Sequence, residues 1–264
     1  MAALIHCNFQ SCVLKMSVDV NVLVPENTRM DLYFKKKNKP VRYQTLYLLH
    51  GFSGDYMTYL RISNIERYAD EHQIMVVMPS VYNSAYTDMK YGLDYFTYIS
   101  EELMHFIEMT FPSSQRREDR FAAGMSMGGY GAYKLGLSFP EKFCAIGGVA
   151  GSYHAEYRYQ GKVTTVSTLC EGLYGDPPQI TPEVHDLFTI LKNLKEQGKE
   201  IPRLYTCCGT EDRRYEDSVD LKKFADANDI PLVFEYGPGR HDAVFFDMYI
   251  QRILKWMGFA GGPV

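Results

Sequence analysis

The chain has 264 residues, of which 46% are hydrophobic, and carries a formal net charge of −4 with an isoelectric point of about 6.0. This length predicts one large domain with ample apolar residues for a core. The acidic balance gives no electrostatic reason to expect binding to nucleic acid or to an anionic membrane. One basic run, at residues 35–39, is interpreted as a solvated loop between two strands.

The cysteines and the N-terminal segment indicate a cytoplasmic protein. The six cysteines show no spacing typical of a zinc site or a disulfide framework, and we interpret them as small core residues in a reducing compartment. The first residues lack both a charged region and a long apolar run, so the sequence predicts no signal peptide and no transmembrane span.

The first half of the chain alternates strand and helix patterns. Two β-rich runs, at residues 3–16 and 17–24, suggest an opening antiparallel pair. Nearly continuous apolar runs at 44–50 and 74–79 are typical of strands covered on both faces. A short helix is expected at 65–72, a loop rich in tyrosine at 80–92, and an amphipathic helix at 93–111.

The second half continues this alternation around one interruption. Strands are expected at 120–124, 143–150, 203–208 and 231–236, with helices at 127–137, 184–197, 215–228 and 242–257. Residues 151–184 are polar and aromatic with little periodicity, and we interpret them as an insertion after the sixth strand, a candidate lid. The whole pattern predicts a mostly parallel α/β sheet with helices on both faces, in a single domain spanning residues 1–264.

The most informative motif is Gly124-Met-Ser126-Met-Gly128, which lies between a predicted buried strand and a predicted helix. This is the pattern of a nucleophile elbow, in which a serine stands on a tight turn at the edge of an α/β-hydrolase sheet. Glycine is required at both flanking positions because a side chain there would collide with the crossing backbone. Ser126 is therefore the candidate nucleophile.

A serine nucleophile needs a base that accepts its proton, and His241 is the best placed of the seven histidines. It follows the last predicted strand and precedes the last predicted helix, where this fold carries its base. His50 also ends a strand, but it precedes Ser126, and we assign it a role in the backbone of the turn that follows.

The acid that orients the base should follow the preceding strand, where Glu211 and Asp212 are adjacent. Asp212 is the better candidate, since the turn leaves Glu211 free to face solvent. The competing interpretation is that Asp212 caps the next helix. Asp242 is a weaker candidate, because a residue adjacent to the base rarely reaches its Nδ1.

An oxyanion hole needs two backbone donors. One should be the N–H of Met127, directly after the nucleophile, and the other should come from the turn after residue 50, at Phe52. Ser53, Tyr82 and Tyr86 are expected to contact substrate from the neighbouring loops.

These motifs, together with His50-Gly-Phe-Ser-Gly54, Tyr91-Gly-Leu-Asp-Tyr-Phe96, Cys208-Gly-Thr-Glu-Asp212 and Gly239-Arg-His-Asp242, resemble the tributyrin-esterase branch of the putative-esterase (esterase D-like) family. The resemblance runs from about residue 2 to residue 258. It implies an α/β-hydrolase carboxylesterase with the triad Ser126, Asp212 and His241. That family often has Glu after the catalytic His and a nearby Trp, where this chain has Asp242 and Phe245 or Phe246.

The expected activity is hydrolysis of short-chain acyl esters, or of aryl and feruloyl esters, through an acyl-enzyme and without a metal or organic cofactor. A thioesterase of the S-formylglutathione type would use the same triad and remains an alternative. A catalytically inactive binding module on the same scaffold is the alternative from another class. The sequence leaves open the natural ester and whether the chain forms a homo-oligomer.

Overall fold

The computed structural model describes residues 2–25, 41–154 and 165–264. The predicted loop at residues 35–39 and part of the predicted insertion, residues 155–164, lie outside these ranges. An eight-stranded sheet runs through the centre in the order β1-β2-β4-β3-β5-β6-β7-β8. Its strands are β1 (Ala3–Gln10), β2 (Ser17–Val24), β3 (Thr45–Leu49), β4 (Met75–Pro79), β5 (Arg120–Met125), β6 (Ala145–Val149), β7 (Arg203–Gly209) and β8 (Leu232–Gly237).

The sheet is mostly parallel, as the sequence predicts. β1 and β2 form an antiparallel hairpin, and β2 joins β4 antiparallel. Every other neighbouring pair is parallel, so the carboxyl ends of β3 to β8 lie along one edge of the sheet. β3, β4 and β5 are buried at every position, which explains their nearly continuous apolar sequences.

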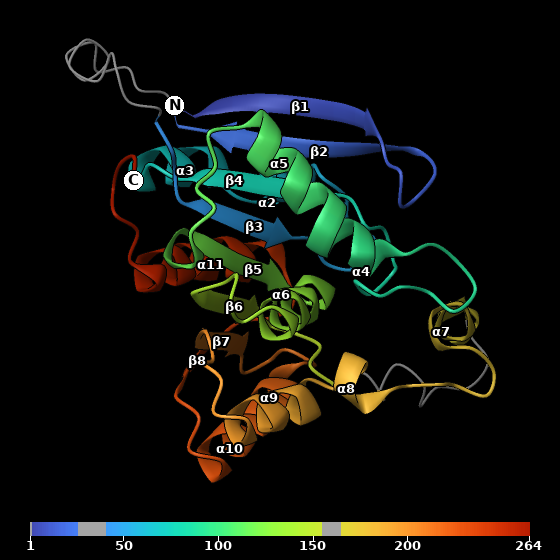
Figure 1. Ribbon diagram of the computed structural model, residues 1–264. Helices are drawn as coiled ribbons and strands as arrows, with labels where there is room; N and C mark the ends of the chain where they lie inside the picture. Colours follow the sequence, from blue (N-terminus) through green and yellow to red (C-terminus); the bar gives the residue numbers. More distant parts are fainter. Residues whose placement is uncertain (1, 26–40, 155–164) are drawn as a thin grey trace.

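Helices cover both faces of the sheet (Figure 1). One apolar cluster involves α5 (Met104–Thr110), α6 (Met127–Ser138), α9 (Leu187–Glu196) and α10 (Tyr215–Ala227). A second cluster, on the other face, involves α2 (Thr58–Ile62), α3 (Ile65–His72) and α11 (Ala243–Met257). The α/β class and the covering of both faces are thus confirmed.

Two helices differ from the sequence expectation in continuity. The helix predicted at 93–111 consists of α4 (Tyr95–Thr97), a π-helical segment (Tyr98–Leu103) and α5. The helix predicted at 184–197 is two helices, α8 (Pro182–His185) and α9, with Asp186 between them. The carboxylate of Asp186 accepts hydrogen bonds from the N–H groups of Phe188 and Thr189, so it caps α9 and separates the two helices.

The sequence analysis also missed two helices. α2 follows the turn after β3, and α7 (Thr165–Tyr174) lies within the segment that was expected to lack periodic structure. The carbonyl oxygens of Gly172 and Leu173, at the end of α7, accept hydrogen bonds from the N–H groups of Tyr91 and Lys90. These bonds attach α7 to the loop after β4, on the carboxyl side of the sheet (Figure 1). Within the described residues, no helix is long and apolar enough to cross a membrane.

Candidate active site

Ser126 lies at the carboxyl end of β5, on the abrupt turn into α6. Its backbone has φ of 53° and ψ of −118°, a left-handed conformation that side chains rarely adopt. The turn is fixed by a hydrogen bond from its N–H to the carbonyl of Val149, on the neighbouring strand β6. Strain of this kind persists only where the surrounding structure enforces it, and it is typical of reactive positions.

The two flanking glycines leave the room that this turn requires. A Cβ at Gly124 would lie 2.3 Å from the carbonyl oxygen of Gly128, and a Cβ at Gly128 would lie 2.0 Å from the carbonyl oxygen of Leu49. Both distances are far below van der Waals contact, so neither position admits another residue without movement of the backbone. The steric reason given from the sequence is therefore the one that the structure shows.

The candidate acid, Asp212, and the candidate base, His241, meet at the ends of β7 and β8. Oδ2 of Asp212 lies 2.7 Å from Nδ1 of His241. The Asp212 side chain is fully buried, whereas that of His241 is 20% exposed. An orienting carboxylate on Nδ1 holds the imidazole with Nε2 free to accept a proton. The competing role for Asp212 is also present, since its Oδ1 accepts the N–H of Arg214 ahead of α10.

The other two carboxylates near the base have different partners. Glu211 is exposed and pairs with the exposed guanidinium of Arg240 at 3.1 Å. Asp242 caps α11 by accepting the N–H of Phe245 at 3.0 Å. Neither contacts His241 through a hydrogen bond, so within the described residues Asp212 is the one carboxylate that is hydrogen-bonded to this imidazole.

Ser126 and His241 follow β5 and β8, on the same edge of the sheet. Ser126 is partly exposed, and within the described residues its hydroxyl makes no hydrogen bond to His241 or to another group. In enzymes without bound substrate, catalytic hydrogen bonds are often long and shorten in the complex. The structure thus joins Asp212 to His241 and leaves the hydroxyl of Ser126 without a hydrogen-bond partner among the described residues.

The predicted oxyanion donors flank the serine. A Cβ at Gly51 would lie 3.4 Å from Cβ of Ser126, which puts the turn containing Phe52 directly beside the nucleophile. Met127 is the first residue of α6, where a backbone N–H has no acceptor within the helix. Across the part of the chain that the structure describes, neither the N–H of Phe52 nor that of Met127 has a hydrogen-bond acceptor. Both are therefore available to an oxyanion.

The turn at residues 50–56 is braced by the loop at residues 80–86, an arrangement that the sequence analysis missed. The N–H of Ser53 donates to Oδ1 of Asn83 at 2.7 Å, and the N–H of Tyr56 donates to Oγ of Ser80 at 3.0 Å. The hydroxyl of Tyr86 donates to the carbonyl of His50 at 2.8 Å. We call these contacts the loop brace. The sequence signal that could have identified the loop brace is Asn83. Its short amide side chain follows β4, and β4 pairs with the strand that leads into the glycine-rich turn.

His50 is part of the loop brace and not of the reacting groups. Its Nε2 lies 3.1 Å from the N–H of Val81, and its Nδ1 lies 2.7 Å from the carbonyl of Gly51. Since Nε2 accepts and Nδ1 donates, the ring is held as one neutral tautomer. Burial lowers the pKa of His50, which favours the same neutral form. The role in the turn that the sequence suggested for His50 agrees with these contacts.

The three predicted substrate contacts differ in accessibility. Ser53 is exposed in the turn itself, and the side chain of Tyr82 is 50% exposed beside it. Tyr86 is 1% exposed and lies under α6, where a Cβ at Gly131 would meet its ring at 2.3 Å. The expectation that Tyr86 contacts substrate therefore disagrees with this geometry, because its ring packs in the core and its hydroxyl holds the loop brace.

Possible metal ligands do not gather in this region. Within the described residues there is no group of three or more His, Cys, Asp or Glu side chains arranged to hold a metal ion. Within the described residues no disulfide joins any of the six cysteines, and Cys170, Cys207 and Cys208 are buried.

The sheet order and the serine on its strained strand-to-helix turn define an α/β-hydrolase of the serine type. The sequence profile of the family described as "Putative esterase" matches residues 11–245. The chain therefore belongs to the putative esterase family and is a carboxylic ester hydrolase.

Three relatives support this assignment over nearly the full chain. An acetyl esterase of Caldicellulosiruptor saccharolyticus is 30% identical and covers 97% of this chain and 98% of its own. The fluorophosphonate-binding serine hydrolase FphF of Staphylococcus aureus is 35% identical, with a TM-score of 0.89 and coverage of 97% and 98%. The S-formylglutathione hydrolase FrmB of Staphylococcus aureus is also 35% identical, with a TM-score of 0.86 and coverage of 97% and 99%.

Proposed function

We propose that the chain is a serine esterase that hydrolyses esters of short acyl groups through a covalent acyl-enzyme. The observation that carries the proposal is the combination of a strained Ser126 with an oriented base, His241, held by the buried Asp212. A similar acetyl esterase, 30% identical over 97% of this chain, supports a short acyl group.

In this mechanism His241 accepts the proton of the Ser126 hydroxyl as Oγ attacks the ester carbonyl. The N–H groups of Phe52 and Met127 donate to the oxyanion of the tetrahedral intermediate. His241 then protonates the leaving alcohol, and a water molecule, deprotonated by the same imidazole, hydrolyses the acyl-enzyme. Asp212 stabilises the imidazolium that forms in each step.

The alcohol or aryl side of the ester is proposed to lie against Tyr82 and under the segment 151–184 as a lid, and Ser53 is proposed to contact the substrate from the turn that contains Phe52. An exposed tyrosine such as Tyr82 offers a flat apolar surface with a polar tip, which suits an aryl or feruloyl group. The location of α7 and α8 on the carboxyl side of the sheet is compatible with a cover over the site (Figure 1).

The function is tested with p-nitrophenyl acetate, butyrate and octanoate. Wild type should release p-nitrophenol fastest from the shorter esters, and Ser126→Ala should lower kcat by about three or more orders of magnitude. A fluorophosphonate probe should label wild type and spare Ser126→Ala. If wild type is folded yet no faster than the variant and resists the probe, the scaffold acts as a binding module and the esterase proposal fails.

A second candidate is a thioesterase of the S-formylglutathione type, which the 35% identity to FrmB favours. The same triad would attack the thioester carbonyl. Comparison of kcat/KM for S-formylglutathione and for p-nitrophenyl acetate decides between the two. A value at least about tenfold higher for the thioester would make the thioesterase the better description.

A further inference from the structure

Two hollows lie on the α2 and α11 side of the nucleophile. The first, which we call the inner hollow, has a volume of about 250 Å³ and is lined by Gly51, Phe52, Ser53, Gly54, Thr58, Arg61, Ile62 and Met125. The second, the outer groove, has a volume of about 460 Å³ and is lined by Ile62, Ala243, Val244, Asp247, Met248 and Gln251. Among the described residues that line them, Ile62 alone belongs to both.

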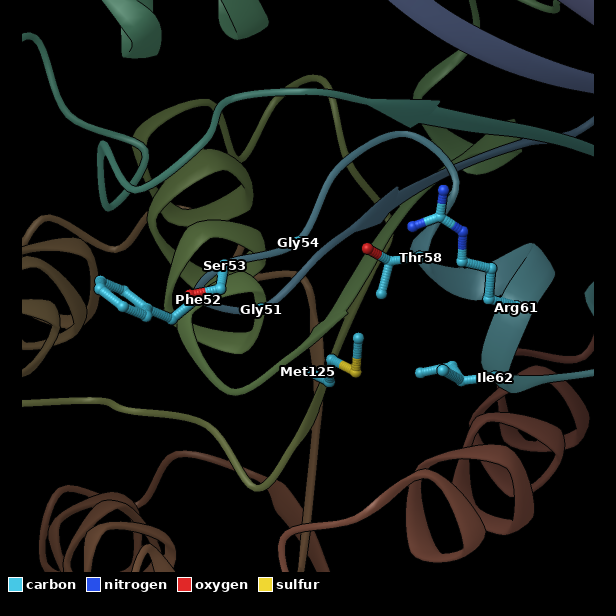
Figure 2. Close-up of a pocket in the computed structure, with 8 residues that line it drawn as sticks. All are labelled: Gly51, Phe52, Ser53, Gly54, Thr58, Arg61, Ile62 and Met125. Carbon is cyan, nitrogen blue, oxygen red and sulfur yellow. The ribbon is translucent and has the colours of Figure 1, made fainter.

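The inner hollow lies next to Ser126, although Ser126 itself does not line it. Met125 directly precedes Ser126, and Gly51 lies against the Ser126 side chain. Figure 2 shows the side chains of Met125, Thr58 and Ile62 around one space, with the ring of Phe52 directed away from it. The hollow therefore lies within reach of a group attached to a carbonyl carbon at Ser126, and the ring of Phe52 does not stand in it.

The position of the base decides which half of an ester fits there. His241 has to protonate the leaving alcohol, so the alcohol must lie on the side of the imidazole. His241 does not line the inner hollow, whereas Gly51 and Phe52 of the oxyanion turn do. With the oxygen at this turn and the alcohol at His241, the inner hollow is the space that remains for the acyl group.

Ile62 stands where an acyl chain would leave the inner hollow. It is the last residue of α2, is partly buried, and packs against the apolar cluster that contains α11. Beyond it the outer groove runs along α11, where Val244 is 74% exposed and Met248 is 48% exposed, beside the polar side chains of Asp247 and Gln251. A longer acyl chain would gain this apolar surface only by passing the Ile62 side chain.

We propose that the inner hollow binds the acyl group and that Ile62 sets its maximum length by separating the hollow from the outer groove. This inference rests on the proposed esterase function and identifies where the acyl group of the ester binds. Acetyl to butyryl groups end before Ile62, while hexanoyl and octanoyl groups meet it. Ile62 is a specificity-determining residue in this arrangement and takes no part in the chemistry.

The test is the acyl chain-length profile of wild type, Ile62→Ala and Ile62→Phe with p-nitrophenyl acetate, butyrate, hexanoate and octanoate. Ile62→Ala should raise the ratio of kcat/KM for octanoate to that for acetate by about tenfold or more, because each accommodated methylene is worth a large factor in an apolar pocket. Ile62→Phe should lower the butyrate value relative to acetate. Leu60→Ala, on the same helix and outside both hollows, should keep the wild-type profile.

The outcomes separate this proposal from the proposed function. If wild type hydrolyses none of the four esters, the esterase function fails. If wild type is active and both Ile62 variants, folded by circular dichroism, keep its chain-length profile, the separation by Ile62 is wrong. A second series with the acetyl group fixed and the alcohol lengthened should be unaffected by Ile62→Ala. If Ile62→Ala changes kcat/KM only in the alcohol series, the hollow binds the alcohol and the proposal is overturned.

Discussion

The two halves of the candidate site are built in different ways. The oxyanion half, residues 50–56, is held by backbone and side-chain hydrogen bonds from residues 80–86, with the fully buried ring of His50 at its centre. The acid–base half depends on one contact, the 2.7 Å bond between Asp212 and His241, and its imidazole is partly exposed.

The difference follows from what each half has to position. An oxyanion hole made of backbone N–H groups works only if a stretch of chain is fixed in space, which takes several bonds. A base needs one ring oriented about two torsions, and a single charge-assisted hydrogen bond can do this. We therefore expect a change of one atom in the acid–base half to lower kcat strongly. The loss of one hydrogen bond in the oxyanion half should lower kcat less.

The sharpest test of this comparison is Asp212→Asn. The amide keeps the shape of the side chain but cannot hold the same tautomer of His241, so kcat should fall by about 10³–10⁴-fold with little change in KM. Steady-state kinetics with p-nitrophenyl acetate measures this. Glu211→Gln is the matched control, since its partner is the exposed Arg240, and should retain wild-type rates. If kcat falls equally in the two variants, Asp212 is not the residue that orients His241.

A smaller effect is expected for Asn83→Ala, which removes the acceptor for the N–H of Ser53. Loss of a whole oxyanion donor costs about 10²–10³ in kcat, so displacing one should cost about tenfold. Asn83→Asp keeps an acceptor oxygen and should recover most of the rate. Inhibition by a boronic acid, which mimics the tetrahedral intermediate, should weaken in parallel with kcat. A variant that lowers only the melting temperature would show that Asn83 serves stability alone.

The smallest expected effect is the contribution of His50 to stability at low pH. Its pKa is lowered in the fold, so below about pH 6.5 the unfolded chain takes up a proton that the folded chain does not. Stability should be unaffected by this group above that pH and should decline as pH falls below it. Urea unfolding between pH 7 and pH 5 should show a shallower decline for His50→Gln than for wild type. An identical decline in both proteins would contradict this linkage.

The features that the sequence could predict are those that glycine and apolar runs specify locally. The elbow around Ser126 requires glycine at positions 124 and 128 for steric reasons. Both glycines lie within two residues of the serine, so a short sequence motif reveals them. The parallel sheet follows from buried strands such as β3, which have no exposed position. Asp212 could be favoured over Glu211 because the turn after β7 allows only one of two neighbouring side chains to face inward.

The features that it could not predict depend on contacts between distant segments. α7 is attached to the loop at residues 90–91 by backbone bonds that carry no side-chain signal. The sequence predicts substrate contact for Tyr86 because it lies in the tyrosine-rich loop at residues 80–92. In the structure its backbone is left-handed, with φ of 51°, and its ring lies beneath α6. The role of Asn83 likewise depends on Ser53, 30 residues earlier in the chain. Pattern analysis assigns a loop to the surface, and it cannot identify which loop residues turn inward.

The carboxyl ends of four adjacent parallel strands share one backbone feature. After β3, β4, β5 and β6 the chain passes through residues other than glycine with positive φ, namely Ser53, Tyr82, Ala85, Tyr86, Ser126 and Ala150. Each such residue costs about 1–3 kcal/mol relative to a relaxed backbone. For protein engineering this edge is a reserve of heat resistance. Ala85→Gly and Ala150→Gly would relieve the backbone but would also remove a buried methyl group and add freedom to the unfolded chain, so thermal tolerance rises only where the relief exceeds both losses, while the sheet beneath stays unchanged.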